Sequence, residues 1–280
     1  MADAFTSVPV KPTLSSYWWV ARNPPANPTT SFRGKTVLIS GANVGLGFEA
    51  VMKFAALGAS NLILGVCSLP KEEQAKVIIE ARTGCSAHVI QLIELDMTSY
   101  QSVENFIQQV NKRFTVVHAA VLNIRVFQQF YKLSLEGWKM LIQVNIISTA
   151  YLRILLLPKL CETGLFISRA AHLEIVASCV QGDVNVKDVC DLSSILQKIN
   201  NLKNFRIGSQ YSISKLLVMT ILGRTTEEGS RTLVTGTLLG PEAHGGFWTH
   251  DRIAMPAILV VTDEGKKLGT QCWKEILDLL

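Results

Sequence analysis

Tyr211 and Lys215 have the residue types and the spacing for proton-transfer chemistry. They stand four positions apart in the run Tyr-Ser-Ile-Ser-Lys, and residues at i and i+4 share one face of a helix. A tyrosine hydroxyl can exchange a proton with a reacting oxygen when a nearby ammonium lowers its pKa from about 10. By itself this spacing is common by chance and usually marks a solvated helix face. A second motif is needed to give the pair a function.

A glycine-rich turn far upstream supplies that second motif. Gly41, Gly45 and Gly47 lie in the run Ser-Gly-Ala-Asn-Val-Gly-Leu-Gly. Glycine lets the backbone approach a phosphate closely, and the N-terminus of a following helix offers unpaired N–H groups and a partial positive charge. The same glycines could simply allow a tight strand-to-helix turn. The turn lies between the first strand and the first helix of an alternating series, which favours phosphate binding.

Short β-rich runs alternate along the chain with segments of helical apolar spacing. The predicted strands are Thr36–Ile39, Asn61–Val66, His88–Leu95, Val116–Leu122 and Leu165–Ile167. The predicted helices are Gly47–Leu57, Lys71–Thr83, Ser102–Lys112 and Leu135–Leu157, the first two closed by Gly58 and Gly84. Strands separated by helices of this length imply an α/β fold with a parallel sheet and right-handed crossovers.

In this order the motifs resemble those of the short-chain dehydrogenase/reductase family. The family pattern is Thr-Gly-x-x-x-Gly-x-Gly, with Ser40 standing in for the threonine, followed much later by Tyr-x-x-x-Lys. The resemblance covers residues 32–220, and the runs at 224–232 and 240–245 resemble a fungal branch associated with secondary metabolism. It implies a Rossmann-like, doubly wound parallel sheet and a nicotinamide dinucleotide, NADP rather than NAD, although NAD stays possible.

The resemblance assigns a set of cofactor-binding residues. They are Gly41, Asn43, Gly45, Leu46, Gly47, Asp96, Asn123, Tyr211 and Lys215. Asp96 matches the adenine-pocket aspartate after the third strand, and it could also cap the helix that follows. Cys67 lies where this branch usually has an arginine for the NADP phosphate, and Lys71 or Arg33 could compensate.

The resemblance also implies the catalytic residues Tyr211, Lys215, Asn145 and Ser168. Asn145 matches an asparagine that holds a water for proton relay, and it could instead satisfy a helix bend. The orienting serine belongs at the end of the fifth strand. The strict match there is Arg169, so Ser168 could serve only if the strand end shifts by one residue. An arginine there could block the pocket, bind an anionic substrate or point outward.

Two stretches depart from the family pattern. The Asn-Ala-Gly turn after the fourth strand reads Asn123-Ile124-Arg125. The bulkier side chains are expected to weaken cofactor binding, because only glycine tolerates some of the backbone conformations needed for close approach without strain. After Lys215, a sixth strand with its Pro-Gly turn is missing, a block of roughly 40 residues. Loss of a central strand should cost many kcal/mol against a total stability of ~5 to 15. The missing block has three alternative explanations: an altered gene product, a wrongly spliced one, or a protein that has rearranged to tolerate the loss.

Length and composition predict one domain. The chain has 280 residues, of which 48% are hydrophobic, enough for a single large core. We expect an N-terminal arm at 1–33, containing Trp18 and Trp19, and a domain at 34–280. No uncharged apolar run reaches the roughly 20 residues of a membrane span; the nearest, Ile146–Leu157, is interrupted by Arg153. The start lacks signal-peptide features, so a cytoplasmic location is expected.

Charge and cysteines exclude other classes. The net charge of +5 comes without a dense basic block, which indicates an affinity for anions more than a nucleic-acid surface, and a phosphorylated cofactor would be a sufficient reason for it. The six cysteines are Cys67, Cys85, Cys161, Cys179, Cys190 and Cys272. Their spacing predicts no metal site and no disulfide framework, but reduced, mainly buried thiols.

The leading hypothesis is an oxidoreductase that interconverts a hydroxyl and a ketone on a hydrophobic small molecule. Tyr211 would be the acid/base and Lys215 its activator. The alternatives are a non-redox binding protein, a cyclisation-guiding enzyme or an inactive truncated homologue, motivated by Arg169, Ile124-Arg125 and the missing block. A sheet edge exposed by a lost strand would further predict a homo-oligomer.

Overall fold

The computed structural model describes most of the chain between residues 24 and 280. The described residues are 22, 24–128, 130–176, 184, 194–204, 207–217, 237–238, 247–249, 252–254 and 262–280. Trp18, Trp19 and the segment 218–236, where the missing strand was predicted, lie outside them, as do Cys179 and Cys190. The domain boundary at residue 33 stays a prediction.

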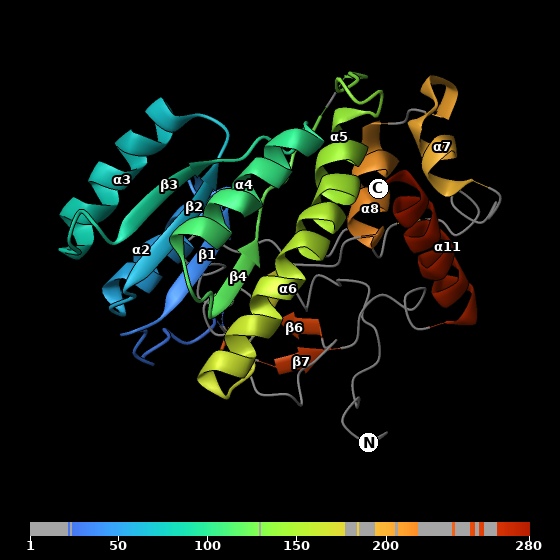
Figure 1. Cartoon of the computed structure of the whole chain (residues 1–280). Coiled ribbons are helices and arrows are strands. Elements are labelled where there is room, and N and C mark those ends of the chain that lie inside the picture. Colours follow the sequence, from blue (N-terminus) through green and yellow to red (C-terminus); the bar gives the residue numbers. More distant parts are fainter. Residues whose placement is uncertain are drawn as a thin grey trace.

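A parallel sheet of five strands forms the centre of the described part (Figure 1). The strands are β1 (Thr36–Ser40), β2 (Asn61–Val66), β3 (Ile90–Glu94), β4 (Ala119–Leu122) and β5 (His172–Ile175). Their order is β3-β2-β1-β4-β5, and every neighbouring pair is parallel. The predicted α/β, doubly wound parallel sheet is confirmed. Because the order reverses between β1 and β4, the sheet has a switch point there.

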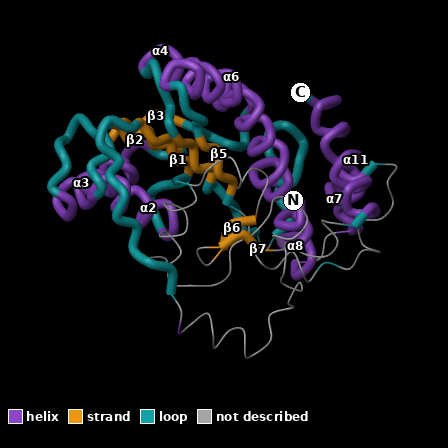
Figure 2. Tube along the Cα trace, turned by 90° about the horizontal axis from the view of Figure 1, so that it is seen from below, coloured by secondary structure: helices purple, strands orange, loops and turns teal. Residues whose placement is uncertain are grey.

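Helices cover both faces of the sheet (Figure 2). On one side lie α2 (Gly45–Ala56) and α3 (Leu69–Thr83); on the other lie α4 (Tyr100–Arg113) and α6 (Thr149–Ile167). Alternation along β1 explains this: Val37 and Ile39 pack with the side chains of α2, whereas Leu38 packs with those of α4 and α6. The two predicted helix stops, Gly58 and Gly84, adopt positive φ angles of 83° and 68°.

The long helix predicted at Leu135–Leu157 begins later and ends later. It comprises α5 (Met140–Ile142), a π-helix η1 (Gln143–Ser148) and α6, which continues past Pro158. Proline removes one helix hydrogen bond, but buried Leu160 and Thr163 hold the next turns: Thr163 Oγ1 accepts the N–H of Val117 at 2.9 Å. The strand predicted at Leu165–Ile167 is therefore wrong, because those residues form the last turn of α6.

The same continuous run is the one stretch within the described residues that is long and apolar enough to cross a membrane. Residues Met140–Ile167 reach a mean hydropathy of 1.7, and 67% of the relevant window is buried inside the protein. The buried side chains Leu152, Leu156 and Leu160 pack against the sheet and α4. A core helix passes the same test of length and composition, and this packing favours the core interpretation.

A third group of helices packs beside α5 and η1. It consists of α7 (Ile195–Asn200), the 3₁₀ turn η4 (Leu202–Asn204), α8 (Ile207–Leu217) and α11 (Asp263–Leu279), and the short antiparallel strands β6 (Phe247–Thr249) and β7 (Arg252–Ala254) complete the described elements. Glu275 of α11 accepts the N–H groups of Ile195 and Leu196, each at 2.8 Å. A carboxylate at a helix N-terminus is favourable, so this contact fixes α7 to α11.

Candidate active site

The glycine turn lies at the switch point of the sheet. Gly41 follows β1 and Asn123 follows β4, the two strands between which the order reverses. In open α/β sheets ligands bind at the carboxyl ends of the strands at this point. Gly41 and Gly45 have φ angles of 70° and 64°, a conformation that side chains other than glycine rarely adopt.

Hydrogen bonds hold the turn against the loop that follows β4. Asn123 Nδ2 donates to the carbonyl oxygen of Gly41 at 2.8 Å. The Ser40 hydroxyl oxygen accepts the N–H groups of Asn123 at 3.0 Å and Ile124 at 3.3 Å. A Cβ on Gly47 would lie 2.1 Å from the carbonyl oxygen of Gly41. The first turn of α2 therefore passes directly against the glycine turn, and only glycine fits there.

The N-terminus of α2 is open to an anion. Its N-cap residue, Val44, is exposed and makes no side-chain cap, and the first turn has no acidic residue. The first N–H groups of a helix lack partners within the helix and carry a partial positive charge. Asn43, Gly45 and Leu46 are partly accessible there. This set fits the pyrophosphate group of a dinucleotide.

Asp96 is the candidate residue for the adenine end of the cofactor. Asp96 follows β3, and its Oδ1 accepts the N–H and the hydroxyl of Thr98, both at 2.8 Å. The N-cap of α4 is Ser99, whose hydroxyl accepts the N–H of Ser102, so the alternative that Asp96 caps this helix is wrong.

The two basic residues expected to compensate for Cys67 lie at opposite edges of the sheet. Lys71 is exposed in the first turn of α3, at the carboxyl edge, as is Cys67 after β2. The Arg33 side chain lies against Gly58 at the amino edge. Of the two, Lys71 can face a cofactor phosphate, and the suggestion of Arg33 is wrong. The mainly buried cysteines were also mispredicted in part, because Cys67 and Cys161 are exposed.

Tyr211 and Lys215 lie on one face of α8, as their spacing predicts. The Lys215 Nζ atom is 5.9 Å from the centroid of the Tyr211 ring. Tyr211 is half-buried, whereas Lys215 is 1% exposed and donates to the carbonyl oxygen of Val176 at 3.4 Å. Because Val176 directly follows β5, this contact places the pair at the carboxyl edge of the sheet.

The surroundings of the Lys215 side chain disfavour its charged form. Burial, and then the nearby positive charge of Arg125, lower the pKa of Lys215 to about 8. The ammonium therefore persists at neutral pH and is lost at alkaline pH. A lysine with this pKa can support a tyrosine at neutral pH and can also give up its own proton.

Asn145 connects the site to α8. It lies in the π-helix, a rare element that often occurs at functional sites. Its Oδ1 accepts the N–H of Val126 at 2.8 Å, and its Nδ2 donates to the carbonyl oxygen of Val126 at 3.0 Å and to the Ser214 hydroxyl at 3.3 Å. The Ser214 hydroxyl in turn donates to the carbonyl oxygen of Tyr211. The Asn145 side chain thus joins the loop after β4 to the helix that carries Tyr211 and Lys215.

Ser168 does not belong to this site. It is the exposed C-cap of α6, with a φ angle of 54°, and both it and the exposed Arg169 lie at the amino edge, opposite Tyr211. The fifth strand is β5, after which the chain continues Val176-Ala177-Ser178-Cys179. The residues that follow the true fifth strand include Ser178 and Cys179, which lie outside the described residues. The apolar run Leu165–Ile167 led the prediction to the wrong segment.

The loop after β4 lines the site with larger side chains than the family pattern has. Ile124 packs on Gly41, where an added Cβ would come within 3.0 Å of Ile124 Cγ1. The Phe127 ring meets the Tyr211 ring edge-on, with centroids 5.3 Å apart. Weaker cofactor binding because of Ile124 stays a prediction.

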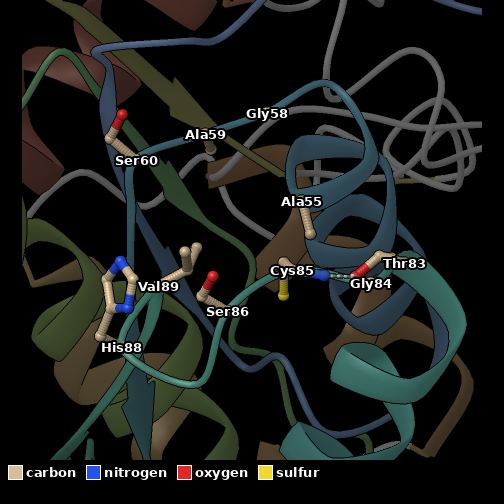
Figure 3. Close-up of a pocket in the computed structure, with 10 residues that line it drawn as sticks. All are labelled: Ala55, Gly58, Ala59, Ser60, Thr83, Gly84, Cys85, Ser86, His88 and Val89. Carbon is tan, nitrogen blue, oxygen red and sulfur yellow. Dashed lines mark hydrogen bonds between the residues drawn. The ribbon is translucent and has the colours of Figure 1, made fainter.

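A cavity of about 380 Å³ lies elsewhere, at the amino edge of the sheet (Figure 3). Ser60, Cys85, Ser86 and His88 line it, between the C-terminal ends of α2 and α3. Helix C-termini carry a partial negative charge, which disfavours a phosphorylated ligand. The candidate active site lies at the opposite edge, where the glycine turn and α8 lie.

The sequence comparisons agree with this geometry. Residues 35–169 match the family model of the short chain dehydrogenases. The chain is 51% identical to the short-chain dehydrogenase/reductase ffsI of Aspergillus flavipes, over all of this chain and 96% of that one. The chain belongs to the short-chain dehydrogenase/reductase family. A second member, phmF of Phaeosphaeria nodorum, is 45% identical with the same coverage.

Solved structures of the family share the fold. A putative short chain dehydrogenase from Escherichia coli CFT073 superposes with a TM-score of 0.51 at 21% identity, over 68% of this chain and 73% of that chain. A structure of that name complexed with NADPH gives a TM-score of 0.50 over 68% and 69% of the two chains.

The alignment with the Aspergillus flavipes protein shows that this chain is shorter than that relative. That alignment has 325 positions against 280 residues in this chain, a difference of 45 positions without a residue here. The size agrees with the block predicted to be missing after Lys215. Its position in the chain stays a prediction.

Proposed function

We propose that this oxidoreductase uses NADP(H) to interconvert a hydroxyl and a ketone on a hydrophobic small molecule. The observation that carries the proposal is the position of Tyr211 and Lys215 at the carboxyl edge of β5, beside the switch point where the glycine turn lies. Asn145 links the two parts, because it bonds both to the loop after β4 and to α8.

The chain's own residues would divide the work as follows. The open N-terminus of α2, with Gly45 and Gly47, would hold the pyrophosphate, and Asp96 would face the adenosine. The bound nicotinamide supplies or accepts the hydride. The Tyr211 hydroxyl would give the substrate oxygen a proton in reduction, or remove one in oxidation, and the Lys215 ammonium would stabilise the tyrosinate.

NADP is favoured over NAD because Lys71 is exposed near the end of β2, where it could meet a phosphate. The NADPH complex of a structural neighbour is consistent with this choice. The relatives are fungal proteins, which supports a role in fungal secondary metabolism. A cytoplasmic location remains part of the proposal.

A non-redox descendant is the second candidate. Ile124 packs on Gly41, where the family pattern leaves room for the cofactor, and the chain is 45 alignment positions short. Such a protein would keep the pocket for binding or for guiding a cyclisation.

Cofactor titration separates the two candidates. Purified protein is titrated with NADPH and NADH, and binding is followed by the fluorescence of the reduced nicotinamide. Saturable binding of NADPH, tighter than that of NADH, is the expected result. If neither cofactor binds, the oxidoreductase proposal is wrong and the non-redox candidate gains.

A further inference from the structure

Arg125 is an unusual residue for its place in the fold. It lies in the loop after β4, at the position where the family pattern has a glycine. Its neighbours in sequence are fixed: Ile124 by the Ser40 hydroxyl at 3.3 Å and Val126 by the two hydrogen bonds of Asn145. The backbone of Arg125 is therefore held at the rim of the site, while its side chain is exposed.

Arg125 and Lys215 place two positive charges near one another. The Arg125 charge is near enough to lower the pKa of Lys215. In the part of the chain that the structure describes, the Arg125 guanidinium has no ion pair, hydrogen bond or ring contact, and the hydrogen-bond partner of Lys215 is a carbonyl. Two like charges destabilise one another, and a bound anion would remove that cost.

The surroundings indicate what kind of anion fits. Phe127, two residues further on, is 57% exposed, and its ring stands edge-on against the Tyr211 ring. An aromatic wall, an acid/base hydroxyl and a guanidinium thus lie along one short loop and the facing helix. The N-terminus of α2 is the site proposed for the cofactor pyrophosphate, and Ile124, next to Arg125, packs on Gly41 there.

We propose that Arg125 recognises an anionic group, such as a carboxylate, on the substrate on which Tyr211 acts. The substrate class is therefore an apolar or aromatic carbonyl or alcohol that carries a negative charge near the reacting carbon. A guanidinium suits this role because its N–H groups match the two oxygens of a carboxylate. The inference rests on the proposed oxidoreductase function.

A matched pair of probes tests the proposal. Benzoylformate and its methyl ester have the same ring and ketone but differ in charge, and calorimetry measures the binding of each to the NADP⁺-saturated protein. Because a hydrogen bond to a charged group outweighs a neutral one, the acid should bind about tenfold more tightly than the ester. Arg125→Gln should bring that ratio to about one, and Arg125→Lys should restore part of it.

Arg169→Gln is the matched control, because it removes another exposed arginine, from the opposite edge of the sheet. It should leave the acid-to-ester ratio unchanged. Equal binding of the two probes by the wild type, no binding of the acid, or a ratio unaffected by Arg125→Gln would each overturn the proposal.

NADPH binding is measured separately for every variant, so that loss of the proposed function is recognised on its own. The same pair of probes is also compared on the cofactor-free protein. A preference for the acid that persists without NADPH binding would keep the anion site and reject the oxidoreductase function.

Discussion

Asn145 binds both polar groups of one peptide residue, Val126, through its side chain. The amide oxygen accepts the Val126 N–H at 2.8 Å and the amide nitrogen donates to the Val126 carbonyl at 3.0 Å. The same nitrogen reaches Ser214 on the helix of Tyr211. One side chain, 1% exposed, thus joins the loop after β4 to the helix that carries Tyr211 and Lys215.

Replacing Asn145 should therefore lower both stability and activity. Asn145→Ala leaves the Val126 N–H and carbonyl without these partners, and we expect a loss of about 2–4 kcal/mol in the free energy of unfolding. Asn145→Asp keeps the acceptor for Val126 and should cost less. Urea unfolding of the two variants measures the difference, and equal stabilities of Asn145→Ala and wild type would contradict the structural role.

Tyr211→Phe should abolish turnover without disturbing the fold. The variant keeps the aromatic ring that meets Phe127 and loses the hydroxyl alone. Loss of a general acid/base lowers kcat by roughly 10²–10⁴-fold, whereas the unfolding midpoint should remain that of the wild type. A Tyr211→Phe variant that turns over a ketone substrate at the wild-type rate would show that another group transfers the proton.

Gly47→Ala should disrupt the cofactor turn. The added Cβ would meet the Gly41 carbonyl oxygen at 2.1 Å and Asn123 Nδ2 at 2.6 Å, and the backbone would have to move. We expect NADPH affinity to fall at least about tenfold, with reduced stability. Gly269→Ala is the control, because a Cβ there has open space in α11 and should stabilise the helix slightly. Fluorescence titration and thermal unfolding compare the two.

Local sequence patterns predicted the parts of the structure that depend on residues close together in the sequence. The β2 bounds, the glycine stops of α2 and α3 and the shared face of Tyr211 and Lys215 follow from spacing within one element. The end of α6 did not, because burial of Leu160 and Thr163 outweighs the helix-breaking effect of Pro158. His172 and Glu174 also interrupt the apolar pattern of β5.

Contacts between distant residues were not predictable in the same way. Nothing in the sequence pairs Asn145 with Val126 or places Arg33 beside Gly58, because both contacts arise from how strands and helices pack. The distinction between Arg125 and Arg169 also needed the fold. From the sequence, Arg169 was a possible anion ligand. In the structure Arg169 lies at the amino edge of the sheet, and Arg125 lies at the carboxyl edge.

The low pKa of Lys215 predicts the pH dependence of activity and stability. In the folded state the pKa is about 8, against 10.5 for the free side chain. Activity should fall as pH rises above about 8, because the ammonium is lost. Between the two values the unfolded chain binds a proton that the folded state lacks, so the free energy of unfolding should rise with pH.

Comparison with Lys215→Met isolates the contribution of Lys215 to the pH dependence of stability. Burial also lowers the pKa of Lys139 to about 8, but Lys139 is present in both proteins. Urea unfolding at about pH 7 and about pH 10 should show that the wild type gains stability relative to Lys215→Met as pH rises. An unchanged difference between the two proteins would mean that Lys215 keeps an ordinary pKa.

Glu72 should show the opposite sign of pH dependence. It lies in α3, is 3% exposed, and its Oε2 atom has no hydrogen-bond partner; burial raises its pKa to about 7 from 4.5. Because the folded state holds the proton more tightly than the unfolded chain, the associated stability is complete below about pH 4.5 and is lost as pH rises through about 7.

Glu72→Gln removes this ionisation and should stabilise the protein at about pH 8 by on the order of 2 kcal/mol, with little effect near pH 5. Glu73→Gln changes an exposed neighbour on the same helix and should have no such effect, so equal shifts for both variants in urea unfolding would argue against a buried neutral Glu72.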